Sequence, residues 1–160
     1  MPKNQDERKS EQNQNKNSRK ICKKEKFSKK ETLKKREILK YLKTTPGFLG
    51  CFKMPHLCSL SICSYPCSFM LNCGEHWIAI TVFKKNVEIF DPLGFKILKW
   101  NQFPCSLLDF LHKFVLTREI VISDKICNRA KLSVFYCLIY VSNRSAYSLS
   151  DIIDYCHRMN

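Results

Sequence analysis

Four segments of this chain carry apolar residues at helical spacing or as a continuous apolar run. Residues 31–43 and 104–116 show the helical spacing, with apolar side chains on one face. Residues 133–142 are almost wholly apolar, which predicts a central helix that is buried on every side. A last helix is predicted over residues 148–157, because a serine followed three residues later by an aspartate is a capping signal. The positions that share a face in the first helix are Leu33, Ile38, Leu39 and Leu42.

Four shorter runs have the character of β-strands. Residues 68–73, 76–83 and 87–91 are rich in aromatic and branched apolar residues, and residues 119–123 form another such run. The polar sequence at residues 84–86 separates the second run from the third and predicts a hairpin turn. We therefore expect an antiparallel pair in the middle of the chain, with the other strands beside it.

The order of helix, strands, helix, strand and helices predicts one small α+β domain over residues 31–160. A chain of 160 residues is long enough for a single domain with a modest core. Within this domain, residues 48–52 are interpreted as a short apolar lead-in, and residues 58–65 as a loop or sheet edge. Residues 1–30 contain almost nothing to bury, so we expect them to be disordered.

The net charge of +14 is concentrated at one end of the chain. Residues 1–44 hold 16 basic and 6 acidic residues, a net +10, whereas the other 116 hold 12 and 8, a net +4. Lysine runs of this kind bind DNA or act as nuclear import signals, and the plainer alternative is a solubilising tail. The runs are Lys23-Lys24, Lys29-Lys30 and Lys34-Lys35-Arg36.

The compartment is predicted to be intracellular and reducing, although the chain has ten cysteines. The N-terminus is polar and lysine-rich, without the apolar region of a secretory signal. No apolar run reaches the roughly 18 residues of a membrane span, so we expect no membrane contact. Most thiols should therefore be free, and several should be buried as small apolar groups.

His56 and the cysteine-rich stretch that follows it are a candidate zinc site. Its spacings are irregular and include no Cys-x-x-Cys pair, whereas structural zinc sites usually contain two close pairs. We therefore expect no metal and no other cofactor. The cysteines of the stretch are Cys58, Cys63, Cys67 and Cys73.

His76 and Asp91 are the candidate pair for acid–base chemistry. His76 begins one strand of the predicted hairpin and Asp91 ends the other, and in an antiparallel hairpin these positions lie side by side. A carboxylate so placed orients an imidazole that serves as a general base. Ser133 begins the buried helix, where the helix dipole and free N–H groups stabilise an oxyanion. In the plainer interpretation, the His-Trp pair and the Asp-Pro-Leu-Gly turn are structural, and Ser133 caps the helix.

Several short motifs, in this order and spacing, resemble the adenovirus-type cysteine endopeptidases (adenains) and their relatives in Maverick/Polinton and adinto-like elements. The resemblance covers Phe48 to about Tyr155. It implies a papain-like fold in which a small mixed sheet packs against a buried central helix. The motifs are Phe48-Leu49-Gly50, Ser68-Phe69-Met70-Leu71-Asn72, Gly74-x-His76-Trp77, Phe90-Asp91-Pro92-Leu93-Gly94-Phe95, Tyr136-Cys137-Leu138 and Tyr147-Ser148-Leu149.

The resemblance implies His76 as the general base and Asp91 as the residue that orients it. It places the nucleophile at Ser133, where the family has cysteine. The family's oxyanion-donating glutamine falls on Ile126, and the nearby Asn128 reaches the site only if the loop is shorter.

Activity is expected to be weak or absent. A serine hydroxyl is far less acidic than a thiol, and loss of one oxyanion donor costs about 10²–10³ in rate. The family's glycine after the nucleophile is Val134. Rescue by Cys127 or Cys137 is an alternative, although Cys137 is better interpreted as packing in the core.

The resemblance implies a monomeric homologue of a viral endopeptidase that processes virion precursors, acting in the host nucleus or the virion on precursor or capsid proteins. Active relatives often cleave after small residues such as glycine, and DNA or a short peptide can stimulate them. A catalytically inactive binding module and a small basic DNA-binding protein are the alternative functions. A SUMO-protease-like role is related, because those enzymes share the fold. The remaining histidines, predicted to be on the surface, are His56, His112 and His157.

Overall fold

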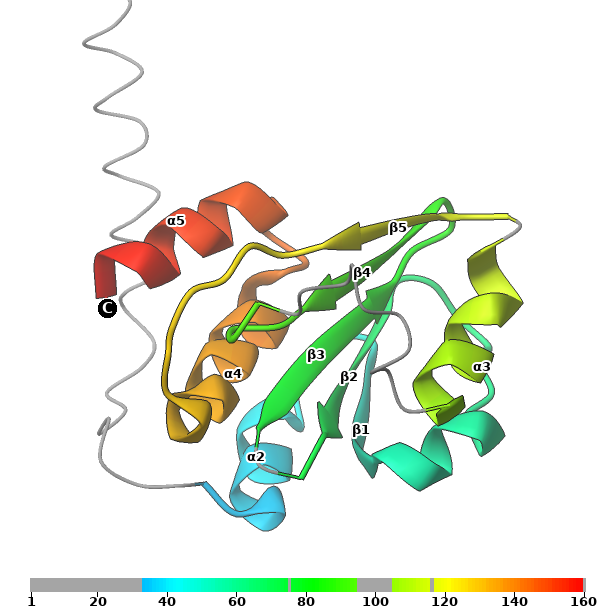
Figure 1. Ribbon diagram of the computed structural model, residues 1–160, viewed down its shortest axis with the longest axis horizontal. Coiled ribbons are helices and arrows are strands. Elements are labelled where there is room, and N and C mark those ends of the chain that lie inside the picture. The colour runs from blue at the N-terminus through cyan, green and yellow to red at the C-terminus, as the bar shows by residue number, and fades with distance from the viewer. Residues whose placement is uncertain (1–32, 75, 95–104, 116, 160) are drawn as a thin grey trace, which may run out of the picture.

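The apolar runs in the middle of the chain form a five-stranded mixed sheet (Figure 1). The structure is a computed structural model that describes residues 33–74, 76–94, 105–115 and 117–159. The two outer strand pairs are parallel and the two inner pairs are antiparallel. In sheet order, the strands are β1 (Phe48–Lys53), β2 (Cys67–Asn72), β3 (Trp77–Val82), β4 (Asn86–Phe90) and β5 (Glu119–Ile122).

Both faces of the sheet are covered, because successive side chains of a strand point to opposite sides. In β2, Phe69 and Leu71 belong to one apolar cluster, and Met70 between them belongs to the other. In β3, Ile78 and Ile80 lie on the first face and Ala79 on the second. Nearly every residue of the three central strands is therefore buried, since neither face meets water.

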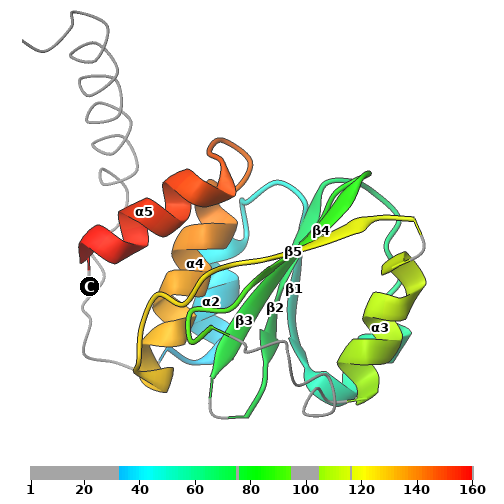
Figure 2. The ribbon, with the colours of Figure 1, turned by 45° about the horizontal axis from the view of Figure 1, so that its top comes forward.

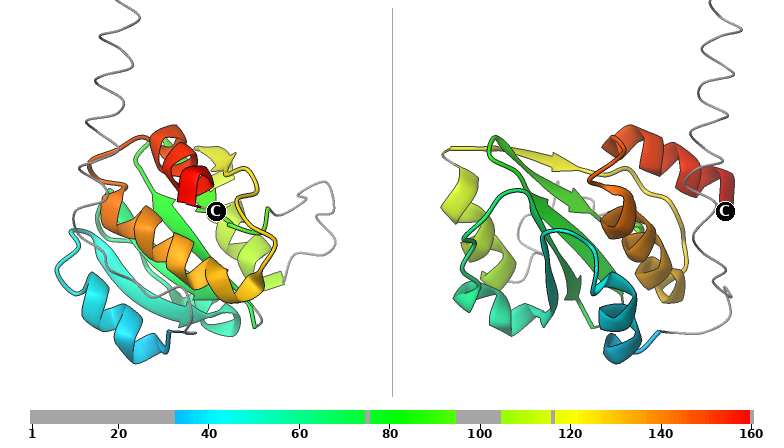
Figure 3. Two further views of the ribbon diagram at one scale, coloured as in Figure 1. Left: turned by 90° about the vertical axis from the view of Figure 1, so that its left-hand side faces the viewer. Right: turned by 180° about the vertical axis from the view of Figure 1, so that it is seen from behind.

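Helices cover the two faces unequally (Figures 2 and 3). On one side, α3 (Cys105–Val115) packs with the 3₁₀ helix η2 (Met54–Ser59). The other side carries α2 (Lys35–Leu42), α4 (Ser133–Asn143) and α5 (Leu149–Met159). The architecture is thus α+β with a mixed sheet, which confirms this part of the expected fold class.

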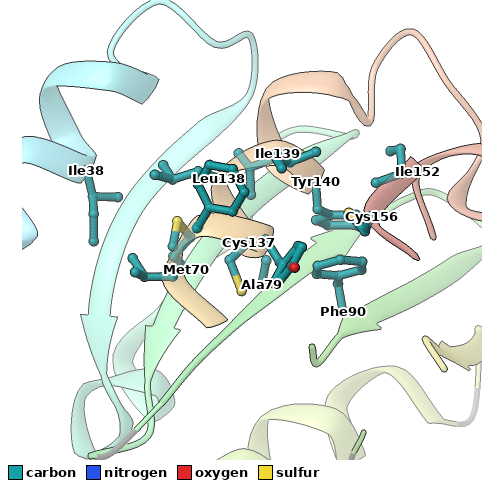
Figure 4. Packing of buried hydrophobic residues seen from close by; sticks show 14 of the residues in the cluster. Ile38, Met70, Ala79, Phe90, Cys137, Leu138, Ile139, Tyr140, Ile152 and Cys156 are labelled. Atoms are coloured by element: carbon teal, nitrogen blue, oxygen red, sulfur yellow. The ribbon is translucent and has the colours of Figure 1, made fainter. Parts of the chain in front are cut away.

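The apolar run that was predicted to be a central helix is α4, and residues 133–141 are all buried. Figure 4 shows this helix between the sheet and α5. Its Tyr140 ring stacks on Phe90 of β4 with ring centres 4.5 Å apart and planes 7° apart. Each large apolar side chain that is removed from water contributes about 1.5–3 kcal/mol, so this cluster is a major source of stability.

The first helix differs from the expected pattern in one detail, whereas the last helix matches it. Leu39 is 37% exposed, so the prediction that it shares the buried face is wrong. Leu39 follows the buried Ile38 directly, and consecutive side chains of a helix point about 100° apart around its axis. The Leu39 side chain therefore points away from the core. The predicted capping signal is confirmed, since Asp151 N–H donates to Ser148 Oγ at 3.1 Å and Ser148 N–H to Asp151 Oδ2 at 3.3 Å.

Two segments between the helices also differ from expectation. Residues 48–52 are not a lead-in, because they form most of β1, which pairs in parallel with β2. Residues 54–59 form η2, and the irregular segment begins only after it. The expected disordered tail, residues 1–30, lies outside the described residues. None of the described helices has the length and apolar character that a membrane crossing requires.

Candidate active site

The hairpin of β3 and β4 brings His76 and Asp91 together. His76 directly precedes β3, and Asp91 directly follows β4. Ala79 pairs with Phe90 in the ladder, so these two chain ends meet at the same end of the sheet. His76 Nε2 lies 3.8 Å from Asp91 Oδ2, with side-chain exposures of 17% and 2%. The juxtaposition that the sequence predicted is present, with the carboxylate deep and the imidazole nearer the surface.

Backbone and hydroxyl groups hold Asp91 in place. Leu93 N–H donates to Asp91 Oδ1 at 2.9 Å, which leaves Oδ2 as the oxygen nearer His76. The buried Ser123 hydroxyl, just beyond β5, accepts a hydrogen bond from Asp91 N–H at 2.9 Å. Sequence reasoning missed Ser123 as a positioning residue, because nothing distinguishes it from the rest of its predicted strand.

Ser133 lies beside this pair but is fully engaged in structural bonds. It is the first residue of α4, and none of it is exposed. Its Oγ accepts from Trp77 N–H at 2.9 Å and donates to the Ala130 carbonyl at 2.6 Å. The helix cap is Leu132, so the interpretation of Ser133 as the cap is wrong. Its hydroxyl instead joins the start of α4 to the start of β3.

The two thiols considered for rescue sit in surroundings that keep them neutral. Burial raises the pKa of Cys137 well above its ordinary value, with a further contribution from the nearby Asp91. Its Sγ donates to the Trp77 carbonyl at 3.3 Å. Burial also raises the pKa of Cys127, which is 2% exposed. A nucleophilic thiol needs a lowered pKa and access, so both are packing residues, as predicted for Cys137.

The loop that precedes α4 does not supply the expected oxyanion donor. Ile126 is buried in the core, and its N–H and that of Cys127 donate to the Pro92 carbonyl at 2.9 and 2.8 Å. Gly94 packs so closely on this loop that a Cβ there would lie 2.5 Å from Lys125 Cβ. Asn128 is exposed on the anchored loop. The structure thus brings His76 and Asp91 together, and it ties Ser133 to Trp77, the residue that follows His76. Asn128 is left at the surface.

A cleft of about 350 Å³ opens beside these residues. Gly74 and Trp77 on one wall are chain neighbours of His76, whereas Ala130 and Val134 are neighbours of Ser133. Val134 is 2% exposed and stands at the position where the resemblance expects glycine. His76, Asp91 and Ser133 do not themselves line this cleft, but residues next to His76 and Ser133 in the chain do. A larger hollow of about 850 Å³ between α2 and the start of β1 is lined by neither set, so we place the candidate site at the smaller cleft.

The remaining groups with possible chemistry are metal-ligand clusters, the cysteines and the other histidines. No group of three or more His, Cys, Asp or Glu side chains in the described part of the chain is arranged to hold a metal ion. The seven described cysteines are free, and five of them are buried. The three remaining histidines, His56, His112 and His157, are exposed, as predicted.

No family model matches the chain, and no curated protein does.

Proposed function

We propose that this chain is a non-hydrolytic homologue of the adenain-type cysteine endopeptidases, and that its former catalytic cleft binds polypeptide. The observation that carries the proposal is the meeting of His76, Asp91 and Ser133 at one end of the sheet. The resemblance expects a general base, its orienting carboxylate and the nucleophile position to meet in this way. The mixed sheet packed on a buried helix is compatible with the papain-like fold that it implies.

Three features argue against hydrolysis. Ser133 Oγ already accepts one hydrogen bond and donates another, and the residue is wholly buried. The nearby thiol of Cys137 is buried and neutral rather than poised to attack. Ile126 has no side-chain donor, and loss of one oxyanion donor alone lowers rates by about 10²–10³. We infer that the chain has lost hydrolytic activity but has kept the cleft.

The partner is proposed from the same resemblance. Active relatives act on virion precursor proteins, so a precursor or capsid protein is the proposed partner, and the virion or the host nucleus is the proposed place of action. A basic N-terminal segment that contacts DNA is compatible with either place, and it is the proposed role of the lysine runs.

The test restores the missing thiol. Wild type, Ser133→Cys and Ser133→Cys/His76→Ala are incubated with glycine-containing peptides, and in parallel with a peptide electrophile. Modification of position 133 is followed by mass spectrometry. We expect no cleavage by wild type, and reaction at position 133 about 10²-fold faster in Ser133→Cys than in the double variant, because an imidazole base contributes at least that much. Ser133→Cys/His112→Ala is the matched control, since His112 is an exposed histidine on α3.

Two outcomes would contradict this proposal. Cleavage by wild type that disappears in His76→Ala would mean a working serine site. Equal labelling rates at position 133 in Ser133→Cys and in Ser133→Cys/His76→Ala would mean that the three residues do not form a protease-type site.

A further inference from the structure

The cleft beside His76 is lined by positive charge from segments far apart in the chain. Lys34 and Lys35 come from the start of α2, Lys53 ends β1, and Lys131 lies in the short 3₁₀ helix η4 (Ala130–Leu132) before α4. All four are exposed. No acidic residue is among the described residues that line the cleft. The bound ligand should therefore be negatively charged.

The floor of the same cleft is apolar. Leu33, Phe52 and Trp77 line it and are all half-buried, so each presents part of its side chain to a ligand. Phe52 is held by an edge-to-face contact with Phe69 of β2, with ring centres 5.9 Å apart. An apolar floor beneath a cationic rim suits a ligand that carries both carboxylates and apolar side chains.

The helices that reach the cleft add to its positive potential. α2 and α4 both begin there, and the start of a helix carries a partial positive charge. Acidic side chains usually occupy such starts, but α4 has none in its first turn. In α2 the single acid, Glu37, accepts a hydrogen bond from Lys34 N–H. The positive charges of Lys34, Lys35 and Lys131 lie near the partial positive charges at the starts of these helices, which is unfavourable. A bound anion would offset both.

Strand β1 favours a peptide over a nucleic acid as the ligand. It is an edge strand, and no strand in the described part of the chain pairs with its outer side. Its bulge lies between Phe48 and Gly50, so the end with Phe52 and Lys53 keeps regular strand geometry. An extended peptide can hydrogen-bond to such an edge through its main chain, whereas a phosphodiester backbone has no N–H groups to offer.

We propose that this cleft binds an extended acidic peptide segment in which Asp or Glu alternates with apolar residues. The acidic side chains pair with the four lysines, and the apolar ones pack on Phe52 and Trp77. This inference rests on the proposed function, because it assigns a ligand chemistry to the polypeptide cleft of a non-hydrolytic homologue.

The experiment measures binding of a fluorescein-labelled peptide of alternating Glu and Leu to the full chain by fluorescence anisotropy. Lys53→Gln/Lys131→Gln removes two charges from the rim. Lys84→Gln/Lys85→Gln removes two exposed charges from the β3–β4 turn and is the matched control, with the N-terminal segment unchanged in both. We expect about tenfold weaker binding in the first variant and a change below about twofold in the second. A peptide with Gln in place of Glu should bind weakly to all three proteins.

A second readout locates the peptide. Binding should shift the fluorescence of Trp77, and Trp77→Phe, which keeps Trp100, should lose that shift. Equal weakening in both lysine variants, or tighter binding of oligodeoxythymidylate that depends on Lys53 and Lys131, would overturn the proposal. The lysine variants retain His76, Asp91 and Ser133. Binding that depends on the rim lysines without His76-dependent labelling at position 133 would therefore overturn only the protease ancestry.

Discussion

The hydroxyl of Ser133 joins two segments that are 56 residues apart in the chain. It accepts the N–H of Trp77 at the start of β3 and donates to the carbonyl of Ala130. Under the proposed function this position has lost its nucleophile, and the serine side chain there holds two segments of the chain together. The residue that defines the candidate site is therefore also one of the links that hold the site together.

Ser133→Ala should destabilise the protein by about 1–3 kcal/mol, because it leaves the Trp77 N–H without its acceptor in a partly buried position. Urea unfolding at neutral pH measures this change. Ser59→Ala is the matched control, since that exposed hydroxyl donates to the carbonyl of the nearby His56, and its effect should stay below about 0.5 kcal/mol. Equal effects of the two substitutions would mean that the Ser133 bond contributes nothing measurable.

At the scale of elements, a buried carboxylate ties the sheet to α4. Glu88 of β4 is 3% exposed. Its carboxylate accepts two hydrogen bonds, each 2.6 Å long, from Arg144, which caps the C-terminal end of α4. Tyr140 donates to the same carboxylate at 2.9 Å, and Arg144 also donates to the Tyr147 carbonyl at 2.8 Å. The guanidinium lies over the Phe83 ring at 4.8 Å. This cluster thus fixes α4, and with it Ser133, against the hairpin that carries His76 and Asp91.

Arg144→Met should destabilise the fold by about 3–5 kcal/mol, since it leaves the Glu88 carboxylate buried without its countercharge. Arg144→Lys keeps the charge but loses the two-pronged geometry, so its loss should be smaller. Glu88→Gln/Arg144→Met removes both charges and should recover part of the loss. Thermal and urea unfolding of the three variants provide the comparison. A loss for Arg144→Met no larger than that for Arg144→Lys would contradict the role assigned to the pair.

At the scale of the whole molecule, neutral thiols are part of the core. Burial raises the pKa of Cys156 to about 12 and that of Cys73 to about 12, from an ordinary value of 9.0, and it also raises the pKa of Cys137 well above that ordinary value. In the unfolded chain these thiols ionise near their ordinary value, while in the folded protein they stay protonated. Their contribution to stability is therefore fully present below about pH 9 and is lost as the pH rises from there towards 12.

The free energy of unfolding should fall above pH 9, by up to about 1.4 kcal/mol per pH unit for each fully buried thiol. Urea unfolding under reducing conditions at about pH 8 and about pH 10 measures the slope. In Cys156→Ala the protein should be less stable at the lower pH, but its stability should fall less steeply. Cys63→Ala, at an exposed position, should keep the wild-type slope. Identical slopes in all three proteins would show that Cys156 ionises equally well in both states.

Local pattern was enough to predict most elements of the fold. The apolar run of α4, the Ser148–Asp151 cap and the hairpin around residues 84–86 depend on residues close in the chain, and all three are present. β1 was missed as a strand because its partner β2 begins only after η2 and a loop. A short strand paired in parallel depends on such a distant partner, and its own residues do not reveal it.

The sequence by itself determined the helices, the central strands and the meeting of His76 with Asp91. Each of these follows from hydrogen bonds and side-chain periodicity over a few residues, or from the geometry of one hairpin. Only the tertiary structure decided that Ser133 is locked by Trp77, that Ser123 holds Asp91, and that lysines from three separate segments line one cleft. These contacts join residues far apart in the chain, so they exist only after the helices have packed on the sheet.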